Sequence, residues 1–68
     1  MKIVSGKELC RILERNGWEL KTIYGSHRVY MKAGRKERVS IPVHGNKDLK
    51  QGLLKAILKI AEISEDEL

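Results

Sequence analysis

The apolar residues of this chain change their spacing at Trp18, and this change limits the folds that the chain can adopt. Before it, Leu9, Ile12 and Leu13 fall on one face of a helix, because they recur with the helical period. From Trp18 onward, apolar and polar residues alternate, which is typical of half-buried strands. A chain of 68 residues has room for one small core, so we expect helices and a sheet in one domain over residues 1–68.

The first helix is predicted over residues 5–16. Ser5 can accept a hydrogen bond from the amide of Glu8, and Glu8 can bond back to Ser5, which makes a capping box worth about 1 kcal/mol. Gly17 follows as the C-terminal cap. Cys10 lies near the edge of the apolar face and is interpreted as a small core residue, so we assign it no chemistry.

A β-hairpin is predicted around Gly25 and Ser26, which suit a two-residue type II′ turn with glycine in the first position. Such a turn fixes which residues face each other, and it places the apolar residues of both strands on one side of the sheet. The predicted pairs are Tyr24 with His27, Thr22 with Val29, Leu20 with Met31, and Trp18 with Ala33.

A third strand is predicted over residues 37–43, with valine and isoleucine on its apolar side. A three-residue loop over residues 34–36 lets this side meet the apolar side of the second strand. The predicted pairs are His27 with Val43, Val29 with Ile41, and Met31 with Val39. On the reverse side Lys32 then faces Arg38, and this like-charge pair favours a bound anion.

A second helix is predicted to follow, with Asn46 or Asp48 as its cap. Its apolar residues form a stripe along one side of the helix. The residues of this stripe are Leu49, Leu53, Ile57, Ile60 and Ala61, with Leu54 and Leu58 widening it.

The end of the chain repeats the capping-box spacing with Ser64 and Glu67. A short turn or helix is therefore predicted over residues 64–68, with Ile63 or Leu68 against the body. The element order is then helix, three strands, helix. Both helices need an apolar surface, so we expect an α+β fold with a three-stranded antiparallel sheet and both helices on one face.

The charge of the chain is basic and unevenly spread. Fourteen Lys and Arg residues stand against nine Asp and Glu residues, and four of the acids lie within residues 62–68. Residues 1–61 therefore carry fourteen basic and five acidic side chains, a net charge of +9. A polyanion is the natural partner of such a surface. The alternative is that the charge only keeps the surface solvated.

The composition argues against several classes of protein. One cysteine excludes an internal disulfide and a cysteine-rich metal site. No apolar run approaches the roughly 18 residues that a membrane span needs, and the start MKIVSGKEL is too polar for a secretory signal. We therefore expect a cytoplasmic protein.

His27 and His44 are the candidate reactive side chains, since the predicted register places both near one end of the sheet. Two imidazoles without Asp or Cys partners are too few for an ordinary metal site, so a metal is rejected. In a basic environment they can transfer protons during cleavage of an RNA phosphodiester. The alternative is that each bonds a backbone group at the sheet end, and this reading is favoured for His44.

The aromatic residues divide between packing and base stacking. Trp18 follows the core side of the sheet and is interpreted as structural. Packing is favoured for Tyr24, whereas stacking on RNA or contact with a partner is open to Tyr30, which is expected on the exposed side.

Three stretches, KELCRILERNGWEL, YGSHRVY and VSIPVHGNKDLKQGLLKAILKIAEIS, together resemble the HicA family of toxin–antitoxin mRNA interferases. The resemblance covers nearly the whole chain. It implies a fold like that of double-stranded-RNA-binding domains, of order αβββα. It also implies that His27 is the catalytic histidine, that Gly25 and Ser26 position it, and that His44 matches a supporting proline-x-histidine position.

The activity implied by the resemblance is cleavage of mRNA without a metal, a cofactor or the ribosome, held in check by a HicB-type antitoxin. RNA contacts, to single-stranded or structured RNA, are expected on the basic side of the sheet and its loop: Lys21, Arg28, Tyr30, Lys32, Arg35, Lys36 and Arg38. The alternative function is a non-catalytic RNA-binding module on the same surface, because a double-stranded-RNA-type fold needs no catalytic group to read RNA shape. A third reading is contact with a protein partner through the apolar surface of Ile23 and Tyr30.

Overall fold

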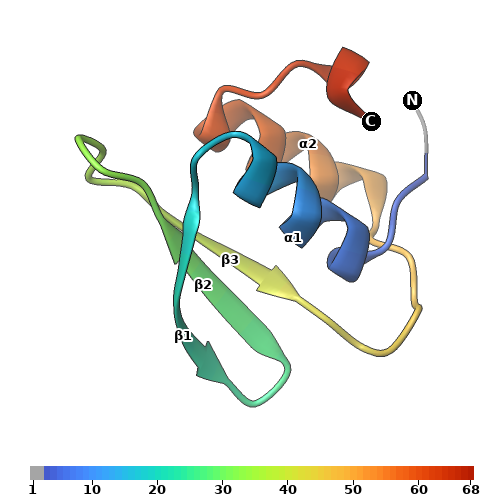
Figure 1. Ribbon diagram of the computed structural model, residues 1–68. Coiled ribbons are helices and arrows are strands. Elements are labelled where there is room, and N and C mark those ends of the chain that lie inside the picture. The colour runs from blue at the N-terminus through green and yellow to red at the C-terminus, as the bar shows by residue number, and fades with distance from the viewer. Residues whose placement is uncertain (1–2) are drawn as a thin grey trace.

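The computed structural model describes residues 3–68 and has a three-stranded sheet with two helices packed on one of its faces (Figure 1). The elements, in chain order, are α1 (Gly6–Arg15), β1 (Glu19–Tyr24), β2 (His27–Met31), β3 (Arg38–Pro42), α2 (Gln51–Ala61) and a 3-10 turn, η1 (Glu65–Glu67). The strands are antiparallel and lie in the order β1-β2-β3. The predicted α+β fold is confirmed.

Helix α1 begins as its sequence predicts. The Ser5 Oγ accepts a hydrogen bond from the amide of Glu8 at 3.2 Å, and the Glu8 Oε1 accepts one from the amide of Ser5 at 3.5 Å. The capping box is therefore confirmed. Gly17 follows the last helical turn with a φ of +91°, and Cys10 is buried among core residues.

The hairpin between β1 and β2 has the predicted two-residue turn, because Tyr24 pairs with His27. Gly25 has a φ of +56°, which glycine adopts without strain and which the first position of a type II′ turn requires. Further along, the register shifts between Leu20 and Thr22. The predicted pairs of Leu20 with Met31 and of Trp18 with Ala33 are therefore wrong.

This register shift lets β1 change sides along its length. Leu20 faces Tyr30 on the helix side, in line with the buried Trp18, whereas Thr22 still faces Val29 on the open side. The bulge thus allows Trp18 to reach the core although Tyr24 points away from it.

The register of β3 differs by one residue from the prediction. The observed pairs are His27 with Pro42, Arg28 with Ile41, Val29 with Ser40, Tyr30 with Val39, and Met31 with Arg38. The connection between the strands holds the six residues 32–37, an even number, where an odd number was predicted. Its turn is closed by a 3.0 Å hydrogen bond from the amide of Arg35 to the carbonyl of Lys32. No like-charge pair of Lys32 with Arg38 forms, so that argument for a bound anion fails.

A one-residue slip exchanges the two faces of a strand, and Tyr30 therefore lies in the core. Its side chain is fully buried, and its hydroxyl donates a 2.7 Å hydrogen bond to the Glu14 Oε2 of α1. Val39 and Ile41 are buried beside it, as predicted for β3. His27 is exposed on the opposite face.

Helix α2 is rotated and begins later than predicted. Leu54 and Leu58 are buried, whereas Leu53 and Ile60 are 39% and 42% exposed. Neither Asn46 nor Asp48 caps the helix, whose N-cap is Lys50 without a side-chain hydrogen bond. The reason is a short backbone bridge, in which Asp48 pairs with Ser5 and the Leu49 amide donates to the Val4 carbonyl. Residues 48 and 49 are thereby held extended.

The end of the chain packs back on α1. The Ser64 Oγ accepts from the Asp66 amide at 3.1 Å, and Ile63 is buried, so the predicted terminal turn is confirmed. The carboxylate of Glu67 does not return to Ser64 but accepts from the side chain of Asn16. Within residues 3–68, no helix has both the length and the hydropathy to cross a membrane.

The approach of α1 to the end of β3 gives a first prediction. A methyl group at Gly6 would collide with the carbonyl oxygen of Pro42, which is backbone and cannot rotate away. We expect Gly6→Ala to lower the free energy of unfolding by about 1–3 kcal/mol, measured by urea denaturation. The matched control is Gly52→Ala in α2, where the added methyl meets open space and the higher helix propensity of alanine adds up to about 1 kcal/mol. Equal effects at the two glycines would contradict this packing.

The buried phenol gives a second prediction. Burial and the hydrogen bond to Glu14 raise the pKa of Tyr30 far above its ordinary value of 10.0. We expect Tyr30→Phe to cost about 1 kcal/mol at neutral pH, through the lost hydrogen bond. The unfolded chain ionises first, so the contribution of the neutral phenol is complete below about pH 10 and is lost as the pH rises further. The stability difference between wild type and variant should therefore shrink above about pH 10. As a control, Tyr24→Phe, which removes an exposed hydroxyl, should change the free energy of unfolding little. A stability difference between wild type and Tyr30→Phe that did not change with pH would contradict the raised pKa of the buried phenol.

Candidate active site

His27 stands at the hairpin end of the open face of the sheet. It opens β2 directly after the Gly25-Ser26 turn, and its imidazole is exposed. Its neighbour on β1 is Tyr24 and its neighbour on β3 is Pro42. Opposed residues of antiparallel strands point to the same side, so these three side chains form a row across the open face. The turn is held against the end of β3 by a 2.7 Å hydrogen bond from the Val43 amide to the Ser26 carbonyl.

The two tyrosines have the reverse of the expected positions. Tyr24, for which packing was favoured, is 72% exposed beside His27. Tyr30, expected on the exposed side, is fully buried between the sheet and α1. Tyr30 therefore offers no surface to RNA, and the aromatic ring next to the candidate histidine is that of Tyr24.

His44 lies two residues beyond Pro42, in an exposed turn. Its carbonyl accepts a 3.0 Å hydrogen bond from the Lys47 amide. The sequence placed His27 opposite Val43, whereas its partner is Pro42, but both histidines still lie at the same end of the sheet. Among residues 3–68, no hydrogen bond joins the two imidazoles or orients that of His27.

A pocket of about 170 Å³ lies beside His44. Its walls come from the end of β3, the loop over residues 44–50 and the first turn of α2. Sequence reasoning did not find it, because these segments are brought together by the bridge between residues 48–49 and the start of the chain. The sequence feature that could have indicated this pocket was the pair of lysines at positions 47 and 50.

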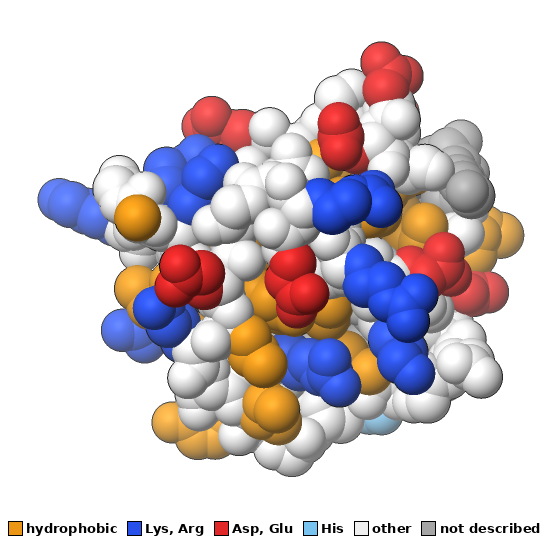
Figure 2. Space-filling model, viewed as in Figure 1, with side chains coloured by type: hydrophobic (Ala, Val, Ile, Leu, Met, Phe, Trp, Pro, Cys, Tyr) orange, Lys and Arg blue, Asp and Glu red, His pale blue; other side chains and the backbone are white. Residues whose placement is uncertain are grey.

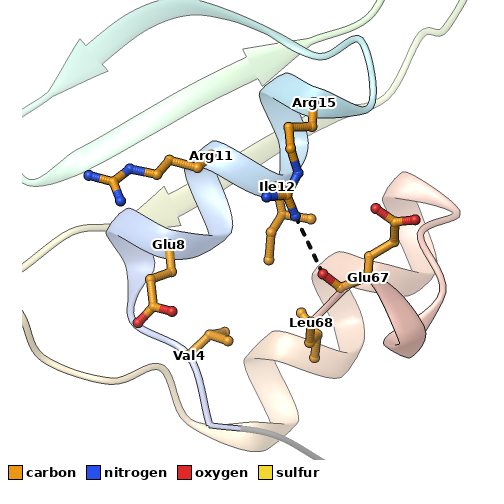
Figure 3. A pocket seen from close by; sticks show the side chains of 7 residues that line it. All are labelled: Val4, Glu8, Arg11, Ile12, Arg15, Glu67 and Leu68. Atoms are coloured by element: carbon orange, nitrogen blue, oxygen red, sulfur yellow. Dashed lines mark hydrogen bonds between the residues drawn. The ribbon is translucent and has the colours of Figure 1, made fainter.

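A second pocket, of about 200 Å³, lies between α1 and the C-terminal end of the chain (Figure 3). It is lined by charges of both signs, among them Glu8 and Arg11, and by the end of the chain. Arg15 crosses toward that end, and its Nη2 donates a 3.5 Å hydrogen bond to the Glu67 carbonyl. None of the candidate site residues contributes to this pocket.

The basic residues predicted to bind RNA do not form one surface. Lys21, Lys36 and Arg38 are exposed, and Arg38 lies on the open face opposite Met31. Arg28 faces Ile41 on the helix side of the sheet and is half-buried. The end of Lys32 lies near Gly17. On the face seen in Figure 2, basic and acidic side chains are interspersed.

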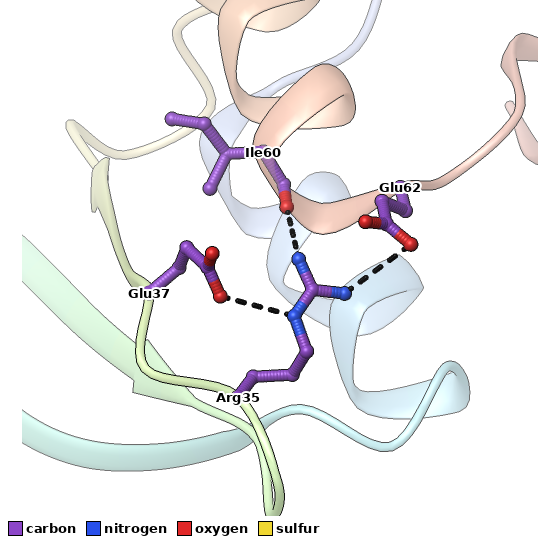
Figure 4. Close-up of polar contacts among 4 residues, drawn as sticks. All are labelled: Arg35, Glu37, Ile60 and Glu62. Atoms are coloured by element: carbon purple, nitrogen blue, oxygen red, sulfur yellow. Dashed lines mark hydrogen bonds and ion pairs between the residues drawn. The ribbon is translucent and has the colours of Figure 1, made fainter.

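Arg35 is engaged within the fold (Figure 4). Its Nε donates to the Glu37 Oε1 at 3.0 Å, its Nη2 donates to the Ile60 carbonyl at 2.9 Å, and its Nη1 lies 3.4 Å from the Glu62 Oε1. The hydrogen bond to Glu37 raises the pKa of Arg35, and the same bond lowers the pKa of Glu37. The guanidinium also lies 5.8 Å from the ring centroid of Trp18. This arginine therefore ties the β2–β3 loop to the end of α2.

The described part of the chain holds no cluster of three His, Cys, Asp or Glu side chains that could bind a metal ion. The chemical groups of the site are thus an exposed imidazole, a neighbouring phenol ring and a second imidazole that lines a pocket. Such groups can exchange protons near neutral pH and can stack on a planar ligand.

Residues 6–63 match the protein family described as the HicA toxin of bacterial toxin-antitoxin systems. The match runs from the start of α1 to beyond the end of α2, so it includes both histidines and the turn before His27. The comparison with curated proteins gives no match. The family match covers most of the 68 residues, and the observed order of helices and strands agrees with the order that the resemblance implied. This chain belongs to the HicA family of toxins from bacterial toxin–antitoxin systems.

Proposed function

We propose that this toxin is a metal-independent endoribonuclease that cleaves mRNA in the cytoplasm, with His27 as a general acid or base. The observation that carries the proposal is the position of His27, exposed on the open face directly after the Gly25-Ser26 turn and within the residues that match the family. An imidazole that served only the fold would gain by burial or by a backbone hydrogen bond, and His27 has neither within residues 3–68.

The reaction needs three functions. A base removes the proton of an RNA 2′-hydroxyl, a cation stabilises the charge on phosphorus, and an acid protonates the departing 5′-oxygen. His27 supplies one proton-transfer group. His44 is the candidate for the other, and Lys47 brings a cation to the pocket that His44 lines.

The remaining groups hold the turn and the substrate. Gly25 and Ser26 position His27, since the positive φ of Gly25 and the bond from Val43 to Ser26 fix the turn. Tyr24 gives a base a ring on which to stack. Phosphate contacts come from the exposed side chains of Lys36 and Arg38, and from Lys21, whose Nζ also lies 3.2 Å from the Glu19 Oε1.

A HicB-type antitoxin is the proposed partner that neutralises the toxin. The open face around His27 is the surface that it has to cover, because a bound RNA would use the same side chains. The side chain of Tyr24, 72% exposed beside His27, gives this region an apolar contact for a protein partner.

The alternative function is a non-catalytic RNA-binding module on the same face. The absence of any hydrogen bond that orients His27, within residues 3–68, favours it, since a general base is normally held by a second group. The two functions differ in whether RNA is cut.

The first test is the fate of a labelled mRNA incubated with purified protein in EDTA. We expect the wild type to cut it and His27→Ala to cut it about 100- to 10,000-fold more slowly, the usual contribution of general acid–base catalysis. Circular dichroism checks the fold of the variant. RNA that stays intact but bound with both proteins would reject the nuclease and leave the binding module.

The second test addresses substrate binding by Tyr24. We expect Tyr24→Ala to weaken RNA binding by about 1–3 kcal/mol, the value of one stacked base, while Tyr24→Phe keeps the affinity. Fluorescence anisotropy with a labelled RNA measures both. Arg38→Ala should instead reduce the slope of affinity against salt concentration, since it removes a phosphate contact. If Tyr24→Phe weakened RNA binding as much as Tyr24→Ala did, the contact would be a hydrogen bond from the hydroxyl and not stacking.

A further inference from the structure

The pocket beside His44 has apolar walls and a charged rim. Pro42, Leu49 and Leu53 contribute apolar walls, and Leu53 is 39% exposed. The pocket volume of about 170 Å³ is below the roughly 300–1,000 Å³ of sites for drug-sized molecules. A single planar ring is therefore a better occupant than a whole nucleotide or a cofactor.

The rim of the pocket suits a ligand that is linked to phosphates. Lys47, Lys50 and His44 contribute to the lining, and all three are exposed. Lysine side chains act as mobile point charges for phosphate groups. An apolar slot with cations at its edge matches a nucleobase whose two flanking phosphates remain in water.

The pocket also lies at the end of the row that contains the candidate histidine. Tyr24, His27 and Pro42 are consecutive neighbours across β1, β2 and β3, and Pro42 is a wall of the pocket. Adjacent strands are about 5 Å apart, so the row spans about 10 Å. An extended RNA strand that crosses the sheet along this row passes the ring of Tyr24, then the imidazole, then the pocket.

We propose that this pocket binds one unpaired nucleobase of the RNA, adjacent to the phosphate that lies at His27. The inference rests on the proposed function and adds to it the group that selects the cleavage site. Asp48 supplies a carboxylate in the lining, which accepts a hydrogen bond from an exocyclic amine. Uracil has no such amine, so the pocket discriminates against it.

The test uses short 2′-O-methyl oligonucleotides of adenine, cytosine or uracil, which lack the attacking hydroxyl and are not cut. We expect wild type to bind the adenine and cytosine probes about tenfold more tightly than the uracil probe in fluorescence anisotropy. Leu53→Ala should weaken binding of the adenine probe about tenfold, because the base loses an apolar wall. Asp48→Asn should narrow the difference between adenine and uracil.

The matched control is Ile60→Ala, which removes a side chain of similar exposure, two turns further along α2 and outside the pocket. It should leave all three affinities unchanged. Equal losses for Leu53→Ala and Ile60→Ala, or no loss for either, would overturn the proposal. So would a Leu53→Ala protein that binds RNA normally but binds the antitoxin weakly, because the pocket would then serve the protein partner.

Failure of the pocket and failure of the nuclease can be told apart, because the probes report binding alone. Affinity that depends on Leu53, in a wild type that cuts no mRNA, would support the pocket and reject catalysis. If cleavage depends on His27 but Leu53→Ala changes neither the RNA affinity nor the bases at the cut, the result would support catalysis and reject the pocket.

Discussion

The pairing register of β2 against β3 decides which residues of the sheet meet water. Side chains alternate along a strand, so the helices can cover either Tyr30 or its neighbours but not both. Tyr30 is the covered residue, opposite Val39 and bonded to Glu14, and this leaves His27 on the open face. A slip of one residue would turn the imidazole toward the helices and the phenol outward. Exposure of the candidate site thus follows from core packing.

That register depends on the six residues 32–37 that connect the two strands, and Arg35 restrains them. Its guanidinium bonds Glu37 within the connection and the Ile60 carbonyl at the end of α2. It also lies near the ring of Trp18, which is buried although its Nε1 has no hydrogen-bond partner within residues 3–68. Arg35, which was expected from the sequence to contact RNA, is therefore used to hold the β2–β3 connection against the end of α2. The net charge of the chain overstates the charge available to a ligand.

The features that could be predicted from the sequence are local ones. The capping box of Ser5 and the hairpin turn at Gly25 are set by residues within three positions of each other, and both were predicted correctly. The register of β3 was predicted wrongly. It depends on whether the connection between β2 and β3 holds an odd or an even number of residues, and the glycine in that connection is compatible with both lengths. The rotation of α2 was missed because apolar residues surround most of that helix, so its pattern does not define one buried face.

The same distinction applies to the site. His27 was found through a contiguous motif, whereas the pocket beside His44 joins three segments that only the fold brings together. Under the proposed function, the geometry of that pocket also limits the form of the RNA. A base that enters the slot has to leave any helical stack, and so does a base that lies on Tyr24. Double-stranded RNA would have to give up pairs at both positions, at a cost of a few kcal/mol for each extruded base. A row that runs from Tyr24 past His27 to the pocket is therefore suited to unpaired RNA, although the fold has the element order of a domain that reads duplexes.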